Sequence, residues 1–433
     1  MFLKKDIMTA YEYLNTKFKI SSEILKTARE IESECADIFK ERDSIREYNQ
    51  YKVILAMQES HLAATHFNWT TGYGYDDAGR EKTEEIFSRI FHTEDALVRP
   101  VIVNGTHALT LCLQGLLFYG DTVVSVSSKP YDTLESVFGI TENPHSLKNA
   151  GVHYEQIDFV DDGEFDYNKI IDRLKNGTFV KMIYIQRSKG YSRRKAIAIS
   201  DIQKLAGIIK EISPKTIIML DNCYGEFLEE KEPTEVGVDI LAGSLFKNPG
   251  GGMTITGGYV CGRKDLINHV AERMTSPNIG RESGLTFGLT RSVLQGLFLS
   301  PSVVSSAVKG AIFCAALFHK YGYDVFPSPD AHRSDIVQSV GLKSAEEMKA
   351  FCKGIQSASP VDSFVSPIPS PMPGYQDDVI MAAGCFIQGS SIELSADGPI
   401  REPYTVYFQG GLTYEHSKFG AMMALNHIMN LYE

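Results

Sequence analysis

The chain has 433 residues, enough for one large domain with a smaller partner or for two to three modest domains. Its composition is that of an ordinary globular protein, with 43% hydrophobic and 22% charged residues. Asp and Glu outnumber Lys and Arg by 54 to 43, and the resulting net charge of −11 argues against a dedicated binder of nucleic acid or of anionic membranes.

The N-terminal sequence MFLKKDIMTAYEYLNTKF lacks the continuous apolar stretch of a signal peptide. No continuous apolar run approaches membrane-spanning length, and AIFCAALF at 311–318 is among the longest. The seven cysteines are scattered and contain no C-x-x-C motif. Reduced thiols in a cytoplasmic protein fit this pattern best.

The pattern predicts three regions. Residues 1–65 are expected to form an N-terminal helical segment, because apolar residues recur at helical spacing from about 22 to 60. A large α/β domain is expected over 66–300. Residues 301–433 predict a smaller α+β domain, which opens on a long helix, continues through strands such as TVYFQGG, and closes with an amphipathic helix.

Seven short apolar runs lie between residues 96 and 262, with helical or polar segments between them. Continuous apolar runs suit strands that are covered on both faces, so they predict a seven-stranded, mostly parallel sheet. Ligands of such sheets gather at the carboxyl ends of the strands. The runs are ALVRPVIV, DTVVSV, GVHYEQIDF, FVKMIYIQ, TIIMLDN, VDILAGSLF and TITGGYVCG.

Two strand ends offer a phosphate seat and an aromatic ring. Gly105 and Thr106 open a helix after PVIV, and their N–H groups and hydroxyl suit a phosphate at the positive end of the helix dipole. A plain turn with Thr106 as the helix cap is equally compatible with the sequence. Tyr131 follows DTVVSVSSKP, where it could stack on a planar ring or simply cover the core.

Two further strand ends carry opposite charges. Asp221 ends the almost wholly apolar TIIML, and a carboxylate there needs a partner. Lys247 follows Ser244-Leu245-Phe246, and a buried lysine amine can form a Schiff base with a carbonyl. The three glycines at 250–252 would let the chain turn sharply and approach a ligand. Phosphate seat, ring, acid and amine are together the set that pyridoxal phosphate requires.

These residues resemble the fold type I pyridoxal-phosphate enzymes, in which the acid precedes the lysine by a few tens of residues. More narrowly, GSLFKNPGGGMTITGGYVCGR, IQRSKGY and TGYGYDDAGREKTEEIF resemble the methionine gamma-lyase-like group often labelled aluminium-resistance proteins, relatives of the cystathionine lyases. The resemblance covers nearly the whole chain. It implies a homodimer or homotetramer with active sites at the subunit interface.

The resemblance also implies a role for each site residue. Lys247 would hold the cofactor as a Schiff base and remove the Cα proton, and Asp221 would keep the pyridinium nitrogen protonated. Tyr131 would stack on the ring. Gly105, Thr106 and Ser244 would bind the phosphate, and Tyr75, rather than Arg80, would reach the phosphate of a neighbouring subunit. Arg401, in the small domain, would bind the substrate carboxylate.

The implied reaction is elimination of a sulfur leaving group from a sulfur-containing amino acid, with release of a thiol, ammonia and a 2-oxo acid. An aminotransferase remains an alternative, as does a cofactor-binding protein with a regulatory or metal-tolerance role and little turnover. No metal site, nucleic-acid partner or membrane partner is expected. The basic segment IQRSKGYSRRK is expected to form a solvated loop.

Overall fold

The computed structural model describes residues 8–161, 163–372 and 377–432. Its residues form two units, each with its own sheet. The large unit comprises Ser44–Ser305 and His332–Ile336, and the small unit comprises Met1–Asp43, Ser306–Ala331 and Val337–Glu433. The N-terminal stretch to Asp43 thus belongs to the small unit, whereas the sequence pattern predicts a separate helical segment over 1–65.

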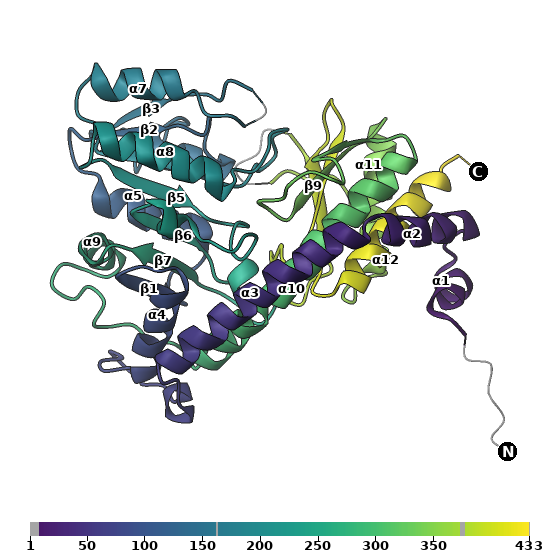
Figure 1. Cartoon of the computed structure of the whole chain (residues 1–433), viewed down its shortest axis with the longest axis horizontal. Coiled ribbons are helices and arrows are strands. Elements are labelled where there is room, and N and C mark those ends of the chain that lie inside the picture. The colour runs from purple at the N-terminus through teal and green to yellow at the C-terminus, as the bar shows by residue number, and fades with distance from the viewer. Residues whose placement is uncertain (1–7, 162, 373–376, 433) are drawn as a thin grey trace. The chain divides into compact units, whose positions relative to one another are not determined.

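The sheet of the large unit has the strand order β1-β7-β6-β5-β4-β2-β3 (Figure 1). β7 runs antiparallel to both of its neighbours, and the remaining pairs are parallel. Each strand coincides with one of the seven apolar runs, so the predicted seven-stranded, mostly parallel sheet is confirmed. The strands are β1 (Asp95–Arg99), β2 (Thr122–Ser125), β3 (His153–Gln156), β4 (Met182–Gln186), β5 (Ile217–Asp221), β6 (Ile240–Ser244) and β7 (Gly258–Gly262).

Helices cover this sheet. Apolar side chains of α5 and α9 share one buried cluster with strand residues such as Leu97, Met182 and Met219, so these helices close one side of the core. The α-helices contained in the large unit are α4 (Ala78–Ile90), α5 (Gly105–Leu116), α6 (Asp132–Phe138), α7 (Tyr167–Lys175), α8 (Ile199–Ile212) and α9 (Lys264–Met274), and the 3-10 turns are η1 (Ala64–Phe67), η2 (Pro233–Val236) and η3 (Asn248–Gly250).

The carboxyl ends of three adjacent strands bring polar side chains to one edge of the sheet. Gln186, Asp221 and Ser244 are the last residues of β4, β5 and β6. Gln186 is in register with Asp221 across the β4–β5 pair. Because parallel strands end on the same side, residues up to 58 positions apart in the chain become neighbours here.

The small unit is built around an antiparallel sheet with the order β10-β11-β12-β9-β8. Helices α11 and α12 pack against each other in this unit, and α2 contacts α12. The elements are α1 (Ala10–Phe18), α2 (Ser22–Glu34), β8 (Asp324–Phe326), β9 (Val337–Gly341), α11 (Ala345–Ala358), β10 (Val379–Ala382), β11 (Ser395–Pro399), β12 (Thr405–Gln409) and α12 (Tyr414–Met429).

Two long helices, α3 (Ala36–Glu59) and α10 (Thr290–Lys320), begin in one unit and end in the other. α10 is the one helix of the described chain that is long and apolar enough to cross a membrane. Its most apolar window is 83% buried inside the protein, as is typical of a core helix. The sequence shows no continuous apolar run of that length because serines and glycines interrupt α10.

Candidate active site

Lys247 lies between the end of β6 and the 3-10 turn η3. Its Nζ lies 4.1 Å from the centroid of the Tyr224 ring, a cation–π contact. Burial lowers the pKa of Lys247, but the acidic groups of four neighbours outweigh burial and raise it above the ordinary lysine value. The ammonium group is therefore held among acids at the carboxyl edge of the sheet. The four neighbours are Cys223, Tyr224, Asp221 and Glu226.

Asp221 supplies the acid predicted beside this amine. One of its carboxylate oxygens accepts the backbone N–H of Cys223 at 3.0 Å. Burial raises the pKa of Asp221, while the charge of Lys247 and the N–H of Cys223 act in the opposite direction. The structure thus brings Asp221 and Lys247 together, although 26 residues separate them in the chain.

The start of α5 meets these strand ends. The side chain of Asn104 caps the helix by accepting the N–H of His107 at 2.8 Å, so Thr106 is not the cap. A Cβ on Gly105 would lie 3.0 Å from the Cys223 sulfur and 3.4 Å from Ser244 Cβ, so a side chain here would push these neighbours away from the start of the helix.

These groups fit a bound phosphate. The Oγ of Ser244 is buried and has no hydrogen-bond partner in the described chain, and an orphaned hydroxyl of this kind calls for a ligand. It lies next to the first residue of α5, where backbone N–H groups and the helix dipole favour an anion. Thr106 Oγ1 is close by in the chain and lies 2.9 Å from Thr133 Oγ1.

Tyr131 lies next to Gly190, in the segment that follows β4. It occupies the N-cap position of α6 without capping the helix through its side chain. Gly190 has a φ of +54°, and a Cβ on it would lie 3.3 Å from the Tyr131 ring and 3.6 Å from the side-chain nitrogen of Gln186. The predicted stacking residue and the Gln186 side chain therefore lie around the same glycine, near the carboxyl end of β4.

The glycines after Lys247 serve the packing of the protein itself. A Cβ on Gly250 would lie 2.0 Å from the carbonyl oxygen of Leu245, and one on Gly251 would lie 2.4 Å from that of Gly296. Gly251 also has a φ of +50°. These two glycines let backbone segments touch, whereas the sequence suggested that they approach a ligand.

Three residues of the site were missed from the sequence. Tyr224 has a φ of +70°, a strained conformation for a non-glycine residue of the kind that clusters at functional sites. Glu226 is buried and accepts the Tyr259 hydroxyl at 2.6 Å, and burial raises its pKa to about 8. Arg187 is fully buried and donates to Asn222 and Gly225, so it fixes the turn after β5. Tyr224 and Glu226 share a signal in the sequence, DNCYGEF, which begins at Asp221, and Arg187 directly follows the neighbouring strand β4.

The prediction that IQRSKGYSRRK forms a solvated loop is wrong for three of its five basic residues. Arg187, Lys189 and Arg194 are all less than a tenth exposed. Their guanidinium and amine groups find partners across the large unit, and spacing in the sequence does not reveal such partners.

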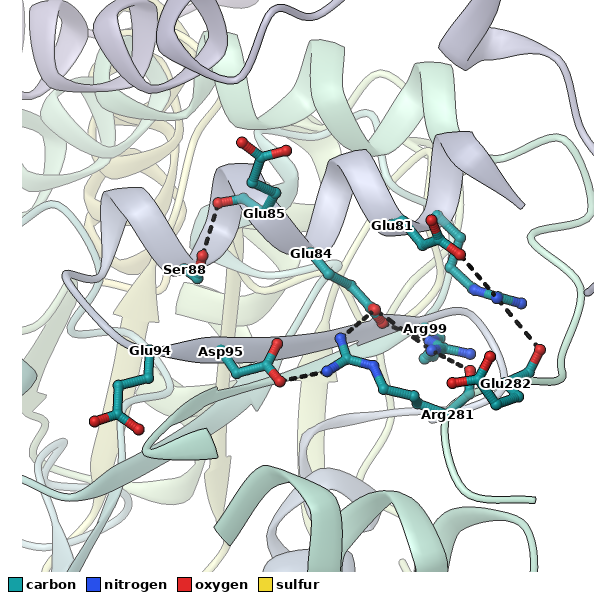
Figure 2. A pocket seen from close by; sticks show the side chains of 10 residues that line it. Glu81, Glu84, Glu85, Ser88, Glu94, Asp95, Arg99, Arg281 and Glu282 are labelled. Carbon is teal, nitrogen blue, oxygen red and sulfur yellow. Dashed lines mark hydrogen bonds and ion pairs between the residues drawn. The ribbon is translucent and has the colours of Figure 1, made fainter. Parts of the chain in front are cut away.

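A cavity of about 310 Å³ is lined by residues of α4, β1 and the segment around 281–282. Figure 2 shows Glu84 between two arginines, with Asp95 on the far side of Arg281. Glu84 accepts from Arg99 at 2.6 Å and from Arg281 at 2.8 Å, and Arg99 also donates to the carbonyl of Ser283 at 3.1 Å. Arg99 and Arg281 thus connect the segment around 281–284 to α4 and β1. We therefore interpret this cavity as part of the packing of the large unit and not as a ligand site.

Arg80 connects the loop that contains Tyr73 and Tyr75 to the segment around 281–284. Its buried guanidinium donates to the carbonyl of Gly74 at 2.6 Å and to that of Gly284 at 3.1 Å. The rings of Tyr73 and Tyr75 stack on each other, with centroids 5.2 Å apart, and both are more than half exposed. Arg80 thus holds the loop within its own chain, whereas Tyr73 and Tyr75 are both exposed to solvent.

Arg401 belongs to the small unit, in the turn between β11 and β12. Its side chain is 58% exposed and pairs with Asp377 at 2.8 Å. Its role as a substrate ligand remains a prediction. Among the described residues, no group of three His, Cys, Asp or Glu side chains is arranged to hold a metal ion.

The sequence matches the methionine gamma-lyase family over residues 24–429. The chain belongs to this family. It is therefore an enzyme of the carbon–sulfur lyase class, and pyridoxal 5'-phosphate is the cofactor of the family. The orphaned Ser244 hydroxyl, the close approach of Gly105 and the Asp221–Lys247 pair are the features that fit this cofactor.

Several proteins of known sequence or known structure are similar to this chain. The uncharacterized protein YnbB of Bacillus subtilis is 48% identical over 406 residues, 93% of this chain and 96% of its own length. A carbon-sulfur lyase involved in aluminum resistance from Clostridium novyi NT has a TM-score of 0.93 and 48% identity, covering 96% of this chain and 98% of its own. The pyridoxal-5'-phosphate dependent protein YhfS of Escherichia coli shares the fold, with a TM-score of 0.61 at 14% identity over 90% of this chain and 97% of its own.

Proposed function

We propose that the enzyme eliminates a sulfur leaving group from a sulfur-containing amino acid such as cystathionine or methionine. Water is consumed, and a thiol, ammonia and a 2-oxo acid are released. The observation that carries this proposal is the pairing of Lys247 with Asp221 at neighbouring strand ends of a chain from the methionine gamma-lyase family.

Each residue of the site has a task in this reaction. Bound pyridoxal phosphate supplies an electron sink for the negative charge that develops at Cα. Asp221 would hold a proton on the ring nitrogen by charge attraction, and Nζ of Lys247 would take the Cα proton of the substrate. Gly105, Thr106 and Ser244 would hold the phosphate, and Tyr131 would cover the ring and exclude water.

The test is a product assay on the enzyme supplied with pyridoxal phosphate. Cystathionine, methionine and cysteine are offered singly, and thiol and 2-oxo acid are quantified separately. We expect the two products in equal amounts from at least one of them, without an added keto acid. Formation of 2-oxo acid only when a second keto acid is present, with no thiol, would identify an aminotransferase and contradict the proposal. No product from any substrate would favour a binding protein with little turnover.

We also propose that the enzyme works as a homodimer or homotetramer in the cytoplasm. Tyr73 and Tyr75 expose a stacked aromatic pair, and Trp69 in the same loop is 52% exposed, a cluster typical of protein interfaces. The cytoplasmic location is supported by the seven cysteines, which all lie in the described chain and form no disulfide.

Sedimentation equilibrium should give two or four times the chain mass of 48.1 kDa. If Tyr75 reaches the phosphate of a neighbour, Tyr75→Phe should weaken cofactor affinity by about tenfold, because one hydrogen bond to a charged group is lost. Tyr119→Phe is the control, since Tyr119 is also exposed but lies far along the chain from the loop. A monomer, or equal affinities in all three proteins, would contradict the proposal.

A further inference from the structure

Glu226 is a buried acid that has no task in the proposed reaction. Its side chain is fully buried in the turn after β5, and one carboxylate oxygen, Oε1, accepts the hydroxyl of Tyr259 at 2.6 Å. The other oxygen, Oε2, is buried and has no hydrogen-bond partner in the described chain. An ionised carboxylate with one unpaired oxygen is costly to bury, whereas a neutral carboxyl group can hold its proton on Oε2 and still accept from Tyr259. This geometry suits a group that exists in both charge states.

Glu226 is attached to the turn that carries Lys247. Its backbone carbonyl accepts the side-chain N–H of Asn248, the residue after Lys247, at 3.1 Å. Tyr259 is in register with Gly243 of β6, and a Cβ on Gly243 would lie 2.7 Å from the Tyr259 ring. Glu226 is therefore fixed from two sides, by the strand that leads to Lys247 and by the turn that follows it.

Two other cations near this turn are paired with other acids. Lys52, on α3, lies 3.7 Å from a carboxylate oxygen of Glu232. Arg187, after β4, pairs with Glu229 at 2.9 Å. Lys247 is thus the cation whose charge acts on Glu226.

The charge of Glu226 changes close to neutral pH. Burial raises the pKa of Glu226 to about 8, and the charge of Glu232 acts in the same direction, whereas the Tyr259 hydroxyl and the charge of Lys247 lower it. Burial also raises the pKa of the Cys223 thiol above its ordinary value, so Glu226 ionises before this thiol as the pH rises. An ionised Glu226 favours the charged form of Lys247 in return.

We propose that Glu226 is a positioning residue that sets the charge of the reactive amine: its ionised carboxylate holds Lys247 in the ammonium form, and its neutral form leaves a larger fraction of the amine uncharged. This inference rests on the proposed function, because it takes Lys247 as the reactive amine. When Nζ of Lys247 accepts the Cα proton it becomes an ammonium group, which an ionised Glu226 stabilises. Glu226 itself gives up and takes up no proton in that step.

The test measures how fast pyridoxal phosphate becomes attached to Lys247 as the pH changes. The full chain, freed of cofactor, is mixed with pyridoxal phosphate and trapped with borohydride at timed intervals, and the label on the peptide that contains Lys247 is quantified. Only an uncharged amine attacks a carbonyl, so the rate reports the uncharged fraction of Lys247. The proteins are the wild type, Glu226→Gln, Tyr259→Phe and Glu230→Gln. Glu230→Gln is the matched control, since Glu230 is an exposed acid of the same segment.

Glutamine has the shape of the protonated acid and cannot ionise. Below a pH of about 8, Glu226→Gln should therefore match the wild type, and above this pH it should react about tenfold faster, because one buried negative charge beside the amine is missing. Tyr259→Phe removes the hydrogen bond that favours ionisation, so the pH at which Glu226 begins to slow the attachment should rise by about one unit. Glu230→Gln should follow the wild type at every pH.

Infrared difference spectra of the same proteins without cofactor report the charge of Glu226 directly. The carbonyl stretch of a protonated carboxyl group should be lost as the wild type passes a pH of about 8. Glu226→Gln should lack this change, and Glu230→Gln should keep it.

Two results would overturn the proposal. One is a ratio of the Glu226→Gln rate to the wild-type rate that is the same at every pH, which is what a purely structural role predicts. The other is an infrared titration that Glu226→Gln leaves unchanged. If Glu226→Gln does not fold, Tyr259→Phe decides, because a profile that fails to move to higher pH contradicts the proposal.

Failure of the proposed function gives a different pattern. If the wild type carries no label on Lys247, this inference fails together with the assigned role of Lys247. If Lys247 is labelled with the expected pH profiles but no substrate yields a thiol, the lyase proposal fails and the role of Glu226 stands. If thiol is released and the rate ratio does not depend on pH, the role of Glu226 fails and the lyase proposal stands.

Discussion

Lys247→Ala is expected to abolish covalent attachment of pyridoxal phosphate and to slow elimination by about 10²–10⁴-fold, the contribution typical of a positioned proton-transfer group. The amine is the group that would hold the cofactor and take the Cα proton, and no water at that position has comparable basicity. The variant should still fold, because burial already raises the pKa values of Asp221 and Glu226, so these acids can take up protons once the ammonium group is gone.

Borohydride reduction followed by peptide mapping measures the first effect. In the wild type incubated with pyridoxal phosphate, the label should lie on the peptide that contains Lys247, and Lys247→Ala should lack it. Lys215→Ala, in an exposed turn before β5, is the control and should be labelled and active like the wild type. Lys189 is the main alternative site of labelling, because its pKa of about 7 leaves much of its amine neutral and reactive. A label on Lys189 instead of Lys247 would contradict the assignment of Lys247 as the lysine that holds the cofactor.

Asp221→Asn is expected to lower kcat by about 10²–10³-fold, the loss typical of removing one electrostatic contact to a developing charge. The amide cannot hold a proton on the ring nitrogen by charge attraction, so the electron sink becomes weaker. The fold should survive, because Oδ1 of an asparagine can accept the N–H of Cys223 as Oδ1 of Asp221 does.

The measurement is kcat together with the thermal midpoint of the loaded enzyme. Asp201→Asn is the control, since Asp201 is exposed on α8 and distant in the chain from the site. The thermal midpoint of Asp221→Asn should lie near that of the wild type, although its kcat is much lower. A variant with a wild-type kcat, or one whose lost activity matches its lost folded fraction, would show that Asp221 is merely structural.

Much of the cofactor site was predictable because it depends on local signals. Apolar runs that end abruptly in Asp221 or in Ser244-Leu245-Phe246-Lys247 mark both the strands and their functional ends. The helix at Gly105 is equally local, although the residue that caps it is Asn104 and not Thr106.

Other features depend on residues that are far apart in the chain. Hydrophobic period and strand termination are encoded within a few positions, so the amino-acid sequence predicts the fold class, the cofactor chemistry and the residues at the strand ends. The tertiary structure was needed to show that β7 lies antiparallel between β1 and β6. It alone showed that Lys189 and Arg194 are buried with Arg333 around Asp335. A charged side chain looks solvated until the segment that covers it is known, and here that segment lies more than a hundred residues away.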